Sequence, residues 1–94
     1  MTSGPLVIEG EFGVYRVAEL KPVLLALVED TGDPAIDLGA VTEMDGAALQ
    51  LLLFAEREAR ARGRQLRLAG ASAAVAEALA VTGLGARFPV AEAV

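Results

Sequence analysis

The sequence contains no cysteine and no histidine among its 94 residues. Without cysteine there is no disulfide framework, no zinc thiolate cluster and no thiol nucleophile. Without histidine the chain lacks the commonest general base, the commonest metal ligand and every histidine-containing catalytic triad. Any catalysis would have to rest on carboxylates, hydroxyls, lysine, arginine or Tyr15.

The remaining groups do not assemble into a catalytic pattern. The acidic pairs Glu9/Glu11 and Glu43/Asp45 are conceivable as paired catalytic carboxylates, but alternation along a strand explains the first pair as solvent-facing. No serine or threonine has a histidine to activate it. We therefore expect a protein that is not an enzyme and that holds no cofactor and no metal.

Aromatic residues are also scarce, at 4%, and no apolar run reaches the roughly 18–20 residues of a membrane span. The net charge of −5 repels a phosphate backbone. Five arginines do lie between Arg57 and Arg67, but acids are mixed among them and no aromatic platform accompanies them. We expect no nucleic-acid partner and no direct membrane insertion. The N-terminal residues lack the pattern of a secretory signal, which favours a cytoplasmic location.

What is abundant is apolar residues, 54% of the chain, enough for the core of one small domain over residues 1–94. β-Branched and aromatic residues on both sides of a glycine predict two short strands at residues 6–8 and 12–15. Further strands are predicted at residues 35–38 and 66–69, with an edge segment at 88–90. Residues 39–44 are predicted as a loop.

Three helices are predicted between these strands. Apolar spacing of three and four marks the first, over residues 20–28, with Pro22 in or near its first turn. The second opens at Asp45 and ends before Gly63, and its back half is predicted to be a solvated surface carrying the pairs Glu56/Arg60 and Glu58/Arg62. Ser72 and Gly83 bound the third helix. The order predicts an α/β domain with a mixed sheet of about four to five strands.

The start of the second helix is the most unusual segment. Asp45 can accept hydrogen bonds from the first free amides of the helix. The tiny residues Gly46, Ala47 and Ala48 then leave the backbone approachable where the helix dipole is positive. The apolar residues that follow cannot all face one sheet; they are Leu49, Leu51, Leu52, Leu53, Phe54 and Ala55. The helix is either clasped on several sides or partly exposed as a partner site, and we favour exposure.

Several segments together carry a resemblance to a known family. Residues 36–38 form a strand with an aspartate, and residues 45–49 (DGAAL) form a loop-to-helix junction followed by a leucine-rich helix. Residues 63–68 and 81–84 fit a later strand and the end of the third helix. The chain resembles the STAS family, the anti-sigma-factor antagonists and their relatives, over nearly its whole length. Residues 50–53 resemble members found beside chemotaxis kinases.

The resemblance implies a regulatory protein-binding module rather than a catalyst. Family members dock the start of this helix against an ATP-dependent serine kinase that doubles as an anti-sigma factor, and phosphorylation of a Ser or Thr after the aspartate breaks the complex. Gly46 and Ala47 occupy those positions here, so neither can accept phosphate. Thr42 is a weak substitute acceptor, because a threonine there is more often a turn former.

The predicted partner site is therefore the start of the second helix, and the predicted partner is an anti-sigma or histidine-kinase-like ATPase, or a chemotaxis kinase. Its residues are Asp45, Gly46, Ala47, Ala48, Leu49, Gln50, Leu51 and Phe54. Two other functions remain open: an accessory subunit on the ATPase of a lipid-transporting ABC complex, as some STAS domains are, and a nucleotide sensor. Pairing of two copies into a homodimer also remains open.

Overall fold

Strands and helices alternate strictly along the chain, as seen in a computed structural model that describes residues 5–30 and 33–88. Each parallel pair of strands needs a crossover connection, and a helix supplies it in both cases. In chain order the elements are β1 (Leu6–Phe12), α1 (Val14–Glu29), β2 (Ala35–Met44), α2 (Gly46–Ala61), β3 (Arg67–Ala71), α3 (Ala73–Thr82) and the short 3-10 helix η1 (Gly85–Arg87).

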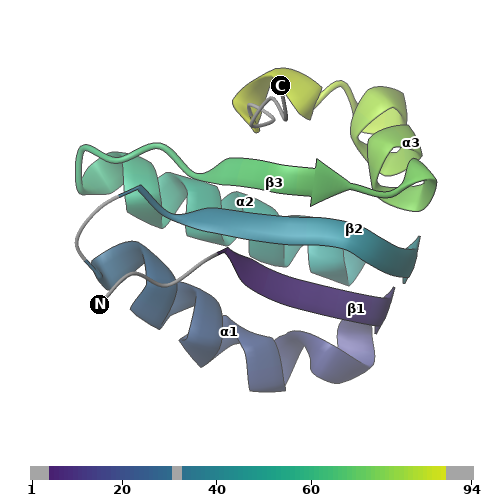
Figure 1. The fold of residues 1–94 in the computed structure, drawn as a ribbon, viewed down its shortest axis with the longest axis horizontal. Coiled ribbons are helices and arrows are strands. Elements are labelled where there is room, and N and C mark those ends of the chain that lie inside the picture. Colours follow the sequence, from purple (N-terminus) through teal and green to yellow (C-terminus); the bar gives the residue numbers. More distant parts are fainter. Residues whose placement is uncertain (1–4, 31–32, 89–94) are drawn as a thin grey trace.

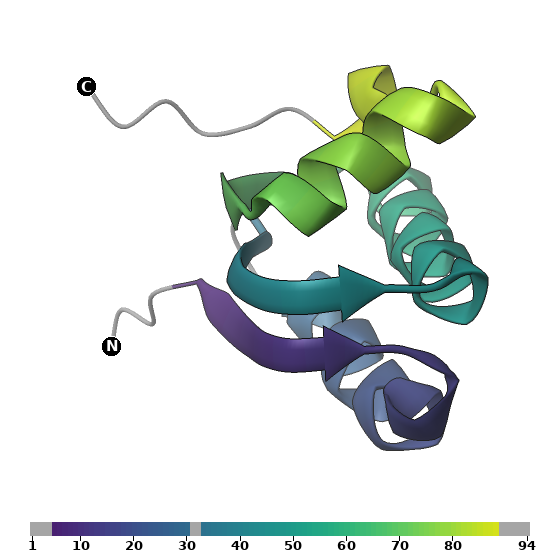
Figure 2. The ribbon, with the colours of Figure 1, turned by 90° about the vertical axis from the view of Figure 1, so that its right-hand side faces the viewer.

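The three strands form one parallel sheet in the order β1-β2-β3. Helices α1 and α2 lie behind this sheet in Figure 1, and Figure 2 shows both of them on the same side of it. Helix α3 follows the end of β3 and packs mainly beside β2. The carboxyl ends of β1 and β2 lie next to each other, and the end of β2 also lies next to α3.

The hydrophobic core lies between the sheet and the two helices behind it. Alternate strand positions point into it, as expected for a sheet that buries one face. Helices α1 and α2 supply residues at helical spacing. The fully buried members include Ile8, Phe12, Ile36, Leu38 and Leu68 from the strands, and Leu24, Val28, Leu52 and Ala55 from the helices.

The first third of the chain differs from the sequence prediction. Residues 12–15 are not a strand, because β1 ends at Phe12 and α1 begins at Val14. Gly10, with φ +76°, lies at an irregularity within the single strand β1 rather than between two strands. Pro22 lies inside α1 instead of near its start. Within the part of the chain that the structure describes, the sheet consequently has three strands, all parallel, where a mixed sheet of four or five was predicted.

Two further predictions about strands are corrected or fall outside the described residues. The predicted loop at residues 39–44 is the second half of β2, where pairing with β1 continues as far as Phe12↔Met44. Phe88 follows η1 and is buried, and it does not belong to a strand. The rest of the predicted edge segment, residues 89–90, lies outside the described residues.

The predicted boundaries of α2 and α3 are confirmed by their capping interactions. Asp45 precedes α2 and accepts a hydrogen bond from the N–H of Ala48 at 3.0 Å. Ser72 precedes α3, and its Oγ accepts from the N–H of Val75 at 3.2 Å. Gly83 ends α3 in the left-handed conformation, with φ +72°, which glycine adopts without strain.

The arginine cluster is largely absorbed by contacts within the chain. The predicted pairs Glu56–Arg60 (2.5 Å) and Glu58–Arg62 (2.8 Å) both form. Glu56 is not solvated, however: it is only 4% exposed, because Arg87 of η1 folds over it at 2.9 Å. Arg64 donates to the carbonyl oxygens of Val28 and Asp30 and so satisfies the end of α1.

Candidate functional site

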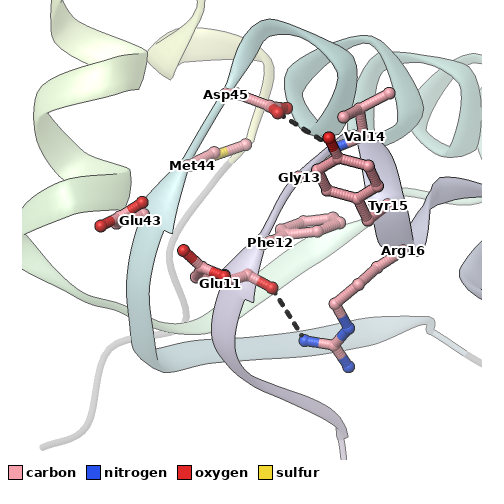
Figure 3. A pocket seen from close by; sticks show the side chains of 9 residues that line it. All are labelled: Glu11, Phe12, Gly13, Val14, Tyr15, Arg16, Glu43, Met44 and Asp45. Carbon is pink, nitrogen blue, oxygen red and sulfur yellow. Dashed lines mark hydrogen bonds between the residues drawn. The ribbon is translucent and has the colours of Figure 1, made fainter.

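One carboxylate joins the starts of two helices. Oδ1 of Asp45 accepts from the N–H of Ala48 in α2 at 3.0 Å. Oδ2 accepts from the N–H of Val14 in α1, also at 3.0 Å, and Figure 3 shows this second bond. Helix α1 has no capping side chain of its own, because Gly13 occupies its N-cap position. The N–H of Asp45 also donates to the carbonyl oxygen of Phe12 at 3.3 Å. The β1–α1 and β2–α2 junctions are thus held together through Asp45.

These hydrogen bonds fix the charge state of Asp45. The N–H of Ala48, followed by that of Val14, lowers the pKa of Asp45 below its ordinary value of 3.8, against a smaller opposing effect of desolvation. Asp45 is therefore a carboxylate at neutral pH, and both of its oxygens are engaged by helix ends. Its role is structural and electrostatic, which agrees with the prediction that Asp45 caps the helix.

Two shallow hollows flank this junction at the carboxyl edge of the sheet. The first, of about 320 Å³, lies between the β1–α1 and β2–α2 connections and is shown in Figure 3. The second, of about 490 Å³, lies between the start of α2 and α3. Both are lined by Glu43, Met44 and Asp45, so they form neighbouring parts of one surface. In parallel sheets this edge is the usual position of binding sites.

We call this surface the junction face and define it by Val14, Tyr15, Met44, Asp45, Gly46, Leu49 and Val81. Three of its apolar members are exposed: Tyr15 is 97% exposed, Val81 79% and Val14 56%. Three carboxylates, those of Glu11, Glu43 and Glu77, lie around these apolar groups. A patch of exposed large apolar side chains on a small domain is typical of a protein-binding surface.

The predicted site residues divide into three groups. Asp45, Gly46 and Leu49 line the hollows. Gln50 is exposed and Ala47 half-buried beside them, and neither lines a hollow.

The other three predicted residues lie in or near the core. Ala48 and Leu51 are buried in this chain and present no side-chain surface to a partner. Phe54 is half-buried, does not line either hollow, and has Nζ of Lys21 4.9 Å from its ring centre.

The expectation of an exposed leucine-rich helix is wrong. Leu52 and Ala55 are fully buried, and Leu49, Leu53 and Phe54 are half-buried against the core. Helix α2 is packed against its neighbours on several sides, which is the other of the two arrangements that the sequence allowed.

The exposed apolar side chains of the junction face come from outside α2: they are Val14, Tyr15 and Val81. Sequence reasoning missed Val14 and Tyr15 because it began the first helix too late, so that Tyr15 was assigned to a strand. The sequence signal that could have revealed them is Gly13 followed by Val14 and Tyr15. This pattern is compatible with a helix start whose first amide is capped by a residue far along the chain.

Three further features bear on other kinds of site: the position of Thr42, groups of residues that could bind a metal ion, and helices that could span a membrane. Thr42 is exposed and lies in β2, on the wall of the second hollow. Within residues 5–30 and 33–88, we find no group of three acidic residues arranged to hold a metal ion. None of the helices described is long and apolar enough to cross a membrane.

Comparison with known proteins decides the family. A family model described as "Mlab, STAS domain" matches residues 2–90. The chain belongs to the STAS family. The predicted resemblance and the single α/β domain are thereby confirmed, with fewer strands than expected. STAS domains of this kind are generally non-catalytic binding modules.

A solved structure shows the same fold for this STAS domain. The Thermotoga maritima protein described as a candidate anti-sigma factor antagonist superposes with a TM-score of 0.80 at 14% identity, covering 94% of this chain and 79% of that chain. At this identity the likeness establishes the fold alone. A search of curated protein sequences gave no match. The comparisons give no support for the predicted link to chemotaxis.

Proposed function

We propose that this STAS domain is a non-catalytic adaptor of the anti-sigma-antagonist type, which binds a kinase-type regulator through the junction face. The cytoplasmic location expected from the sequence belongs to the same proposal. The observation that carries it is the exposed apolar set of Val14, Tyr15 and Val81 beside the start of α2. Burying such side chains against a partner removes apolar area from water, which is the main driving force for association.

The proposed adaptor is constitutive rather than switched by phosphate at the family position. Gly46 and Ala47 have no hydroxyl group, and a phosphate would otherwise add about −1.5 to −2 charges at the contact. A Cβ atom on Gly46 would have no neighbour within 4 Å, and its φ is not left-handed, so the fold itself does not require a glycine there. A close-approaching partner backbone would explain why the position is so small.

Two neighbouring positions on α3 allow a matched test. Val81 lies on the junction face, whereas the exposed residue Ala80 does not line either hollow. Val81→Asp and Ala80→Asp introduce the same charge at the same end of the same helix, so they should change folding stability similarly. The tagged wild type and both variants are used to capture partners from the extract of the native cell.

We expect the wild type and Ala80→Asp to retain one kinase-type ATPase, and Val81→Asp to lose it. Equal retention of the ATPase by all three proteins would contradict a partner site at the junction face. Retention of no kinase-type protein would contradict the proposed partner class.

A second candidate function is favoured by the description of the matching family model. In this alternative the domain is an accessory subunit bound to the ATPase of a lipid-transporting ABC complex. The same capture experiment separates the two: an ABC ATPase together with a membrane permease, and no kinase, would support the accessory role and exclude the adaptor role.

A further inference from the structure

The charges around the junction face define the kind of segment that fits it. We infer that the occupant is a basic amphipathic segment of the partner, with a stripe of apolar side chains flanked by lysine or arginine. This inference rests on the proposed function and adds to it the chemistry of the partner. It rests on three observations: the exposed apolar residues of the junction face, the surrounding carboxylates that make no ion pair, and the hydrogen bonds of Arg16 to the backbone of β1.

The carboxylates around the face have no cation of their own. Glu43 and Glu77 make no ion pair with any part of the chain that the structure describes, and neither does Glu11. They lie on the walls of the two hollows, on either side of the apolar residues. Exposed carboxylates beside an apolar contact favour a partner of opposite charge, both in steering the encounter and in setting its register.

Arg16 does not neutralise them. Among the described residues that line the two hollows it is the one cation. Its Nη1 donates to the backbone carbonyls of Glu9 (2.6 Å) and Glu11 (3.1 Å), and Figure 3 shows the bond to Glu11. Its Nε also lies 3.8 Å from the carboxylate of Glu19, outside the face. The guanidinium is therefore directed at the backbone of β1 rather than at the carboxylates of the junction face.

The same contact argues against a different mode of binding, in which a partner adds a strand to the sheet. Among the described strands β1 lies at an edge of the sheet, and the backbone carbonyls of its Glu9 and Glu11 both accept from the side chain of Arg16. Arg16 already occupies those two acceptors. The junction face lies at the ends of the strands, where side chains rather than backbone hydrogen bonds make the contact.

A second copy of this chain does not supply the required basic stripe. Two copies each carry a net charge of −5 and repel each other at long range. Three of the five arginines of the cluster, Arg60, Arg62 and Arg64, are engaged by carboxylates or carbonyls within the chain.

Tyr15 also favours a basic partner, because the face of an exposed tyrosine ring attracts lysine and arginine.

Two designed peptides test the inference directly. One is a helical peptide of about 18 residues, long enough to be stable in isolation, with a leucine stripe flanked by lysines. Its twin has glutamate in place of every lysine. Backbone amide chemical shifts of the full-length domain are followed during titration with each peptide. We expect shifts centred on Tyr15, Met44 and Leu49 with the basic peptide, weakening as salt is raised, and no binding of the acidic twin.

A matched pair of double variants assigns the effect to the face. Glu43→Gln/Glu77→Gln removes two carboxylates from the hollows, and Glu9→Gln/Asp33→Asn removes two exposed carboxylates elsewhere. We expect the first double variant to bind the basic peptide about three- to tenfold more weakly than the wild type at low salt. We expect the second to change the affinity for the basic peptide less than twofold. Equal binding of both peptides, binding of neither, or equal loss in the two double variants would overturn the inference.

Failure of the basic-segment inference can be distinguished from failure of the proposed function. If capture of the natural partner depends on Val81 but is unaffected by Glu43→Gln/Glu77→Gln, the adaptor function stands and the basic-segment inference is wrong. If capture is insensitive to Val81, the proposed function fails whatever the peptides do.

Discussion

Gly13 and Asp45 are in contact across 32 positions of the chain, and the contact leaves room for no side chain on Gly13. A Cβ atom at Gly13 would lie 2.7 Å from Oδ2 of Asp45, the same oxygen that accepts from the N–H of Val14. The backbone of Gly13 is extended, with φ −149°, so any residue could adopt it. Glycine is required there by the approach of the carboxylate and not by backbone conformation.

The first prediction concerns Gly13→Ala. The added methyl group should displace the Asp45 carboxylate and remove the cap of α1, lowering the melting temperature by about 4–8 °C, the shift expected for loss of one cap in a domain of this size. The check is a double-mutant cycle. In an Asp45→Ala background the methyl group has nothing to displace, so Gly13→Ala should cost little there. An equal loss in both backgrounds would show that the contact is not the cause.

The second prediction is a pH dependence. Because the pKa of Asp45 is lowered in the folded chain, its ionised form stabilises the fold above about pH 3.8, and this contribution is lost as the pH falls through the lower folded-state value. Asp45→Asn keeps the shape but removes the charge. The difference in melting temperature between the wild type and Asp45→Asn should be largest near neutral pH and should shrink in acid. A difference that stays constant down to about pH 2.5 would contradict the lowered pKa.

The third prediction reverses the sign of the first. Gly46→Ala should raise the free energy of unfolding by about 0.4–1 kcal/mol, because the new Cβ meets nothing and the unfolded chain loses freedom. Thermal unfolding measures this. If the small residue serves a partner, the same variant should bind it more weakly although it is more stable. A variant less stable than the wild type would show a structural need for glycine that the geometry does not reveal.

The fourth prediction separates structural from exposed arginines. Arg64→Ala should lower the free energy of unfolding by roughly 1–3 kcal/mol, because it frees the carbonyls of Val28 and Asp30 at the end of α1. Arg57 is exposed and makes no ion pair among residues 5–30 and 33–88. Arg57→Ala should therefore change stability by less than about 0.5 kcal/mol. Denaturant unfolding of the wild type and both variants, fitted with one common m-value, gives the free energies of unfolding to be compared.

The sequence predicted those features that depend on near neighbours. Ser72 and Gly83 bound α3 as expected because a cap acts on amides and carbonyls within one turn of it. The ion pairs of Glu56 and Glu58 formed because residues four apart share a helix face. The family resemblance likewise rested on short contiguous segments, among them the junction at residues 45–49.

The features that were missed depend on contacts between distant parts of the chain. Helix α1 starts at Val14 because Asp45, far along the chain, accepts its first amide, and no local pattern indicates this. Glu56 is buried because Arg87 from η1 covers it, although its helix neighbours alone predicted a solvated position. The composition of the junction face was missed for the same reason, since Tyr15 reaches it only through the early start of α1.

The shared cap at Asp45 has a consequence for how the domain meets a partner. Tyr15 and Leu49 stand on the first turns of two different helices, yet both turns are anchored to the same side chain. The relative spacing of the two backbone segments that carry them is therefore set before any encounter. For the proposed partner site this arrangement lowers the cost of ordering on binding, because the two helix starts need not be brought together at the moment of contact.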